Sequence, residues 1–89
     1  MNPALVPQFA PGMRLRHDQA RDRWTVMGPE RMFLPDGTAL EVLRLVDGQR
    51  SVDAIIDDLA VRFAAPREEI GADVQALLAE LMTKGVVRA

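Results

Sequence analysis

Hydrophobic and polar positions alternate along the first third of the chain, and this pattern predicts β-strands. The runs 13–18, 23–27 and 30–34 are separated by a polar turn at 19–22 and by Gly28-Pro29. An alternation of period two places the apolar side chains of each run on one face of a sheet. Because the connections are short, we expect a three-stranded antiparallel meander over about residues 13–35.

After Pro35 the apolar spacing changes to that of helices, and three helices are predicted over about residues 37–84. Asp36 or Thr38 is placed to cap the first, which we expect to end before Gly48. Ser51 is placed to cap the second, and Pro66 stands at the first turn of the third. Three strands followed by three helices predict an α+β fold with a three-helix bundle packed on a small sheet.

Residues 1–12 contain three prolines and end in Gly12, so no regular helix is expected there. We interpret them as an N-terminal arm that lies on the surface or on a partner. Residues 13–89 are then one domain, since 89 residues suffice for one small domain only. Val86-Val87 is expected to be a short extended tail.

The chain contains few strand-like runs, so we expect the run from Glu30 to Leu34 to lie at a sheet edge. An edge strand presents unpaired N–H and C=O groups that a protein must cover, blunt or use. The interpretation that we favour is that this chain uses them to hold a peptide.

Composition narrows the possible functions. The chain has no cysteine, which excludes disulfides, thiolate metal sites and a cysteine nucleophile. Neither a signal peptide nor an apolar run long enough for a membrane span is evident, and a cytoplasmic protein is the expectation. Through Pro35, five Arg oppose three acidic residues, giving +2, whereas from Asp36 on six basic residues oppose ten acidic ones, giving −4.

The side chains do not form a catalytic pattern. His17 is the single histidine, and on an alternating strand it is more often structural or exposed than a ligand. Asp57-Asp58 and Glu68-Glu69 are adjacent on helices, so the members of each pair point in different directions. We therefore expect no enzyme activity, no catalytic residue and no metal site.

A winged helix-turn-helix that binds DNA is an alternative for this order of elements. Its recognition helix would carry Arg or Lys to phosphates and bases. The third predicted helix instead has two basic residues, Arg67 and Lys84, against four acidic ones, a net charge of −2. Nucleic acid is therefore a disfavoured partner.

In the order and spacing of its motifs, the chain resembles the pyrroloquinoline quinone (PQQ) biosynthesis protein D family. The motifs that carry the resemblance are Met13-Arg14-Leu15-Arg16-His17-Asp18, Arg21-Asp22-Arg23-Trp24, Pro29-Glu30-Arg31, Leu45-Val46-Asp47-Gly48, Glu68-Glu69-Ile70 with Asp73-Val74, and Lys84-Gly85. The sequence departs from the family pattern at Pro35-Asp36-Gly37, which bears on where the third strand ends.

The resemblance implies a winged helix-turn-helix-like peptide-recognition element that carries no cofactor and does no chemistry itself. Such a peptide chaperone binds a ribosomally made precursor peptide by strand addition and presents it to a radical S-adenosylmethionine (SAM) enzyme, which cross-links Glu and Tyr side chains. The implied groove lies between the third strand and the third helix. The expected peptide-binding residues are Arg31, Met32, Phe33 and Leu34 on the strand and Asp73, Leu77, Leu78 and Leu81 on the helix, with Trp24 in the core.

Two other hypotheses stay open beside this one. One is the DNA-binding winged helix, and the other is a structural adaptor that binds the maturation enzyme but not the peptide. If the chain self-associates, we expect a homodimer formed by exchange of the same strands, because an unoccupied edge pairs readily with a second copy.

Overall fold

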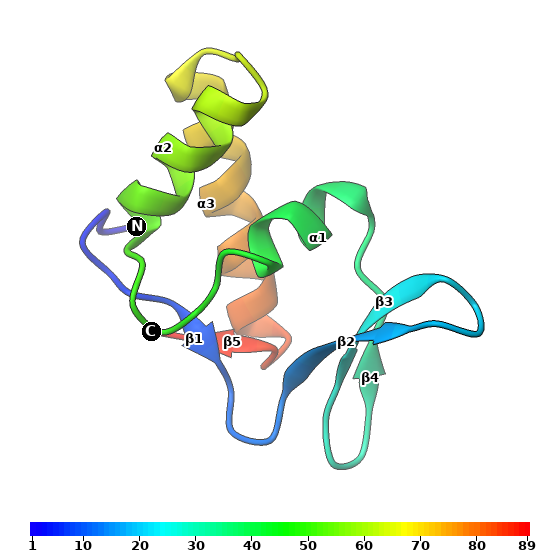
Figure 1. Ribbon diagram of the computed structural model, residues 1–89. Helices are drawn as coiled ribbons and strands as arrows, with labels where there is room; N and C mark the ends of the chain where they lie inside the picture. The colour runs from blue at the N-terminus through cyan, green and yellow to red at the C-terminus, as the bar shows by residue number, and fades with distance from the viewer.

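The three strands and three helices follow one another in the predicted order, and the α+β fold class is confirmed (Figure 1). The computed structural model describes residues 1–89. The sheet has the order β2-β3-β4, and a two-stranded sheet pairs β1 with β5. The bounds are β1 Gln8–Phe9, β2 Arg14–Asp18, β3 Arg23–Met27, β4 Met32–Phe33, α1 Gly37–Leu43, α2 Val52–Arg62, α3 Arg67–Thr83 and β5 Val87–Arg88.

The antiparallel register of the sheet explains its two faces. Val26 is completely buried and lies opposite Leu15 on β2 and Phe33 on β4, so these three form the face that packs on the core. Met27 lies opposite Met32, and both are on the other face because side chains alternate along a strand.

The third strand is shorter than predicted, two residues instead of the run from 30 to 34. The Gly28 N–H bonds the Arg31 carbonyl in a tight turn, which occupies the chain up to Arg31. Pro35 has no N–H to offer a ladder, and Asp36 is committed to capping α1. Only Met32 and Phe33, which lie between this turn and this cap, therefore pair as a strand.

The sequence predicts the helix caps better than it predicts where the first helix ends. Asp36 caps α1 by accepting a hydrogen bond of 2.8 Å from the Ala39 N–H, and Ser51 caps α2 through the Ala54 N–H. The prediction that α1 extends nearly to Gly48 was wrong, because the helix ends at Leu43. After it the chain tightens into turns, in which the Leu45 N–H bonds the Val42 carbonyl and the Val46 N–H bonds the Leu43 carbonyl, and Leu45 and Val46 are buried in the core.

The N-terminal arm is part of the fold rather than a loose surface segment. Its Gln8–Phe9 pairs antiparallel with Val87–Arg88 at the other end of the chain, and Figure 1 shows the two strands side by side. The carbonyls of Pro3 and Leu5 accept the N–H groups of Asp53 and Val52 in the first turn of α2. Those N–H groups would otherwise have no partner within the helix.

The core is built mainly from the helices. Its largest fully buried side chains include Leu43 of α1, Ile55 of α2, and Leu78 and Leu81 of α3. The expectation that Trp24 belongs to the core was too strong: the ring is half-buried, and the Arg44 guanidinium lies 4.7 Å from its centroid. None of the helices has the length and apolarity that crossing a membrane requires.

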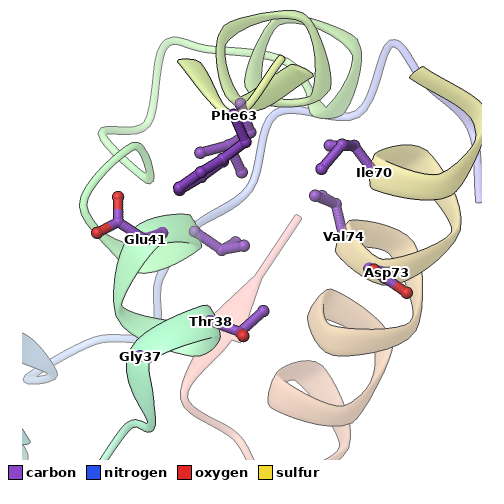
Figure 2. Close-up of a pocket in the computed structure, with 9 residues that line it drawn as sticks. Gly37, Thr38, Glu41, Phe63, Ile70, Asp73 and Val74 are labelled. Atoms are coloured by element: carbon purple, nitrogen blue, oxygen red, sulfur yellow. The ribbon is translucent and has the colours of Figure 1, made fainter. Parts of the chain in front are cut away.

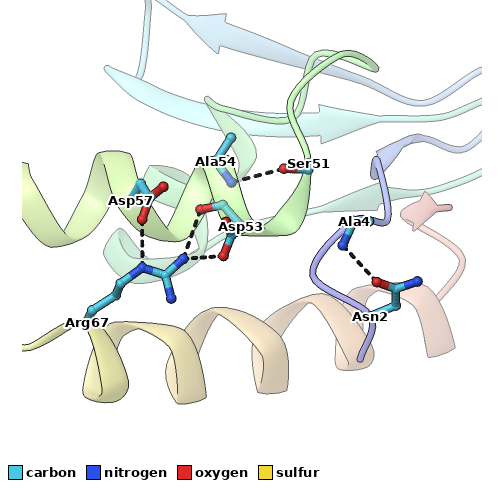
Figure 3. Close-up of polar contacts among 7 residues, drawn as sticks. All are labelled: Asn2, Ala4, Ser51, Asp53, Ala54, Asp57 and Arg67. Carbon is cyan, nitrogen blue, oxygen red and sulfur yellow. Dashed lines mark hydrogen bonds and ion pairs between the residues drawn. The ribbon is translucent and has the colours of Figure 1, made fainter.

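Arg67 at the start of α3 ties that helix to α2 (Figure 3). Its guanidinium donates to the Asp57 carboxylate at 2.6 Å and also to Asp53. The hydrogen bond to Asp57, followed by that to Asp53, raises the pKa of Arg67 above its usual range. Because the three groups are about half exposed, the pairs set the geometry of the helices more than they stabilise them.

We predict that removing residues 1–9 destabilises the domain by about 2 kcal/mol or more, because α2 loses two carbonyl acceptors and β5 loses its partner strand. Urea unfolding followed by circular dichroism measures this. Removing only Met1, which is exposed and makes none of these hydrogen bonds, is the control and should leave the midpoint nearly unchanged. An equal midpoint for the longer deletion would contradict a structural role for the arm.

Candidate functional site

β4 is an edge strand, as the sequence predicts, since only β3 pairs with it. The Gly28–Arg31 hydrogen bond fixes which backbone groups are free. In an antiparallel ladder, hydrogen-bonded pairs alternate, so Val26 and Phe33 form the next bonded pair and Met32 lies between bonded pairs. The N–H and C=O of Met32 therefore point away from β3, toward the open edge.

The side chains along this edge differ in burial. Met32 is 54% exposed and Leu34 is 50% exposed, so both present apolar surface to a ligand. Phe33 is half-buried and packs against the core, and the Lys84 ammonium lies 5.3 Å from its ring centroid. This contact joins β4 to the C-terminal end of α3.

Arg31 reaches the same end of α3. A Cβ added at Gly85 would lie 2.6 Å from the Arg31 Nη2, so the guanidinium occupies space that any larger residue would take. Gly85 also has a φ of +75°, a conformation that favours glycine. Lys84 is paired with Glu80 at 2.8 Å, whereas Arg31 makes no ion pair, so Arg31 supplies the unpaired positive charge at this end of the strand–helix junction.

The predicted α3 residues divide into two groups. Leu78 and Leu81 are completely buried in the core, so they offer no surface to a ligand and support the site from behind. Asp73 is exposed and Leu77 is half-buried. At 100° per residue, Asp73, Leu77 and Lys84 fall along one flank of the helix, beside the buried stripe. We call these three residues the α3 flank.

A pocket of about 440 Å³ opens at the other end of the α3 flank, between α1, the end of α2 and α3. Figure 2 shows Thr38 of α1 and Asp73 of α3 on opposite walls, with Phe63 at one end. The residues that line the pocket are Gly37, Thr38, Glu41, Val42, Leu59, Phe63, Ile70, Asp73 and Val74.

Of these residues, only Asp73 was among the predicted site residues. Phe63 is 53% exposed although it follows the apolar spacing of α2, and that exposure is visible only once the helix end is placed. Glu41 is held by a 2.8 Å ion pair with Arg62, whereas Asp73 makes no ion pair within the chain. Asp73 is therefore available to a cationic ligand group.

The site combines an open strand edge, an apolar pocket and a charge gradient. Arg31 and Lys84 lie at the β4 end, and Asp73 and Glu41 lie at the pocket. Such an arrangement suits an extended polypeptide, which supplies main-chain partners for the edge and side chains for the pocket. No group of three or more His, Asp or Glu side chains is placed to hold a metal ion.

His17, the one histidine, lies outside this site. Its Nε2 is 3.1 Å from Oδ1 of Asp22, and its ring centroid is 4.9 Å from that of Trp24. The side chain is 34% exposed, in the hairpin of β2 and β3. This agrees with the structural or exposed position that the sequence predicts.

Comparison with known proteins finds relatives that share one name. A curated "PqqA binding protein" of Gluconobacter oxydans (strain 621H) is 54% identical over 82 residues, which cover 92% of this chain and 85% of the relative. The protein of the same name from Rhodopseudomonas palustris (strain BisB5) is 53% identical over 83 residues, 93% of this chain and 78% of the relative.

Two solved structures are similar over the whole chain. The solution NMR structure of the PqqD truncation of Methylobacterium extorquens PqqCD has a TM-score of 0.77 and 36% identity, and covers 100% of both chains. It is described as a stand-alone recognition element for ribosomally synthesized and post-translationally modified peptides. The crystal structure of PqqD from Xanthomonas campestris has a TM-score of 0.62 and 37% identity, covering 100% of this chain and 99% of the other.

The model of one protein family matches residues 23–87, from the start of β3 to the start of β5. This match covers most of the chain, and the identities above extend it over more than nine tenths. The chain therefore belongs to the coenzyme PQQ synthesis protein D (PqqD) family.

Proposed function

We propose that this chain is a cytoplasmic peptide chaperone that binds the ribosomally made precursor peptide of PQQ biosynthesis and presents it to a radical SAM enzyme. The observation that carries the proposal is the open edge of β4 beside the α3 flank. The relatives named "PqqA binding protein" and the recognition element from Methylobacterium extorquens support the same reading.

In this proposal the peptide adds a strand to β4. It bonds the outward N–H and C=O of Met32, and its side chains alternate between the two faces of the extended sheet. Arg31, Met32, Phe33 and Leu34 form the strand wall, and Asp73 and Leu77 form the helix wall. Leu78 and Leu81, which were expected on that wall, act only by holding α3 in place.

The pocket gives the proposed complex its direction. An apolar side chain of the peptide fills the space beside Phe63 and Val74, and a basic residue next to it pairs with Asp73. Toward the other end, the unpaired Arg31 guanidinium favours an acidic residue. A peptide that runs the opposite way would place like charges together at both ends.

The short edge limits the affinity. Each main-chain hydrogen bond contributes about 0.5–1.5 kcal/mol net, and two residues of strand supply few of them. The apolar anchors must therefore provide much of the binding free energy against the cost of ordering the peptide. We expect a dissociation constant on the order of micromolar.

We predict that the precursor peptide slows hydrogen exchange at the Met32 amide more than at the Phe33 amide. The Met32 N–H faces the open edge and gains a partner, whereas the Phe33 N–H already bonds β3. Exchange measured by NMR with and without peptide tests this. Equal slowing at both amides and throughout α2 would indicate global stabilisation without strand addition.

We predict that Asp73→Lys weakens peptide binding by about tenfold, because a basic group on the peptide then meets a like charge at the pocket. Isothermal titration calorimetry gives the affinity. Glu68→Lys is the matched control, since Glu68 lies on the same helix with the same charge but points away from the α3 flank. Equal losses in the two variants would remove Asp73 from the site.

Self-association is proposed to compete for the same edge. A second copy that pairs with β4 occupies the main-chain groups that the peptide needs, whereas exchange of the strands flanked by Gly28-Pro29 rebuilds the groove from two chains. We predict that excess peptide shifts a homodimer of the first kind toward monomer in sedimentation velocity, and that one of the second kind binds one peptide per protomer. A dimer whose stability is independent of the peptide would place its interface elsewhere.

A further inference from the structure

The face of the sheet that points away from the core carries a cluster of arginines. Arg16 of β2 and Arg23 of β3 lie on this face by the alternation that turns Val26 inward, and Arg21 is in the turn between the strands. Met27 and Met32 continue the same face toward β4. We call Arg16, Arg21, Arg23, Met27 and Met32 the arginine face.

These arginines lack carboxylate partners within the chain. The cationic side chains of Arg50, Arg62, Arg67 and Lys84 each form an ion pair in the helical part, but neither Arg16, Arg21 nor Arg23 forms one. Arg14, Arg31, Arg44 and Arg88 also form no ion pair, so what distinguishes the sheet is that three unpaired arginines gather on one face of it.

The acidic residues near the arginines are engaged elsewhere. Asp18 accepts the backbone N–H groups of Ala20 and Arg21, and Asp22 pairs with His17. The Nε of Arg23 is buried without a hydrogen-bond partner. The guanidinium groups therefore form a surface of positive charge that is not compensated internally.

This surface is hollowed and partly apolar. A depression of about 590 Å³ is lined by Arg16, His17, Asp18, Gln19, Arg21, Arg23, Thr25, Met27 and Met32. Met27 is 37% exposed and Met32 is 54% exposed, which adds adaptable apolar area beside the charges. Arginine and methionine together are typical of the buried part of protein–protein interfaces.

We propose that the arginine face docks the acidic surface of a protein partner while the peptide occupies the β4 edge. Charge complementarity determines the chemistry of that partner, since unpaired guanidinium groups bind carboxylates bidentately. Nucleic acid fits less well, because the helical part carries a net charge of −4 and would repel a polyanion.

The position of the arginine face indicates which protein binds to it. Met32 belongs to both the arginine face and the peptide edge, so a protein docked there lies against the outward side chains of the bound peptide. This assignment rests on the proposed function, in which the docked protein is the radical SAM enzyme that modifies the peptide. The chain would then hold peptide and enzyme on adjacent surfaces.

The test uses the double variant Arg16→Glu/Arg21→Glu, in which both altered side chains are exposed. Binding of the full-length radical SAM enzyme should weaken by at least about tenfold, whereas affinity for the precursor peptide should stay unchanged. Arg50→Glu/Arg88→Glu is the control, with the same change in net charge on exposed residues away from this face. The variant Arg16→Gln/Arg21→Gln should show an intermediate loss, and it serves if the glutamates impair folding.

Several results would overturn the proposal. They are an unchanged enzyme affinity in both sheet variants, an equal loss in the control, or no binding of the enzyme to the wild-type chain. Loss of duplex DNA binding or of a wild-type homodimer, with enzyme binding intact, would assign the face to those ligands instead. Failure of the wild-type chain to bind the peptide would contradict the proposed function. In that case the titration with the enzyme would still test whether the arginine face binds the enzyme.

Discussion

The burial of Leu78 and Leu81 determines how α3 is rotated about its own axis, and the candidate site depends on that rotation. Both side chains are completely excluded from solvent, together with Ile55 of α2 and Val26 of β3. A rotation of α3 that exposed either leucine would cost about 1.5–3 kcal/mol of apolar burial for each. The neighbouring flank of the helix is therefore fixed, and Asp73 faces the pocket while Lys84 contacts Phe33.

The strand wall is fixed from its other side by the two ends of the chain. A domain of 89 residues has a small core, so few elements can be left unpaired. Pairing of β1 with β5 holds the segment after α3, where Gly85 lies beside the Arg31 guanidinium. The pairing of the two termini thus positions Arg31, the residue before β4, although neither terminus belongs to the site. β4 itself keeps one open edge, which is the feature that a peptide can use.

Local patterns in the sequence predicted the elements well, because caps and alternation are local. Ser51 and Asp36 cap their helices, and the third strand is the expected edge. The end of α1 was not predictable from spacing alone, because Leu45 and Val46 stay buried although the hydrogen bonds change there from i→i−4 to i→i−3. Pairing of Gln8–Phe9 with Val87–Arg88 joins opposite ends of the chain and leaves no local signal.

The candidate site was predicted only in part for a related reason. An apolar stripe at helical spacing does not distinguish residues that face the core from those beside them, so Leu78 and Leu81 were assigned to the groove together with Leu77. The pocket collects residues from α1, α2 and α3, and Phe63 acquires its role only when these helices meet. The charges of the sheet were visible in the sequence, but their lack of partners depends on where each carboxylate points.

In the proposed complex the peptide lies along the open edge of β4 beside the α3 flank. Intermolecular nuclear Overhauser effects between isotope-labelled chain and unlabelled precursor peptide locate it. Strand addition at this edge predicts contacts between peptide backbone protons and those of Met32, together with contacts from peptide side chains to Leu77 and Phe63. Contacts confined to β2, the opposite edge of the sheet, or to the arginine face would contradict it.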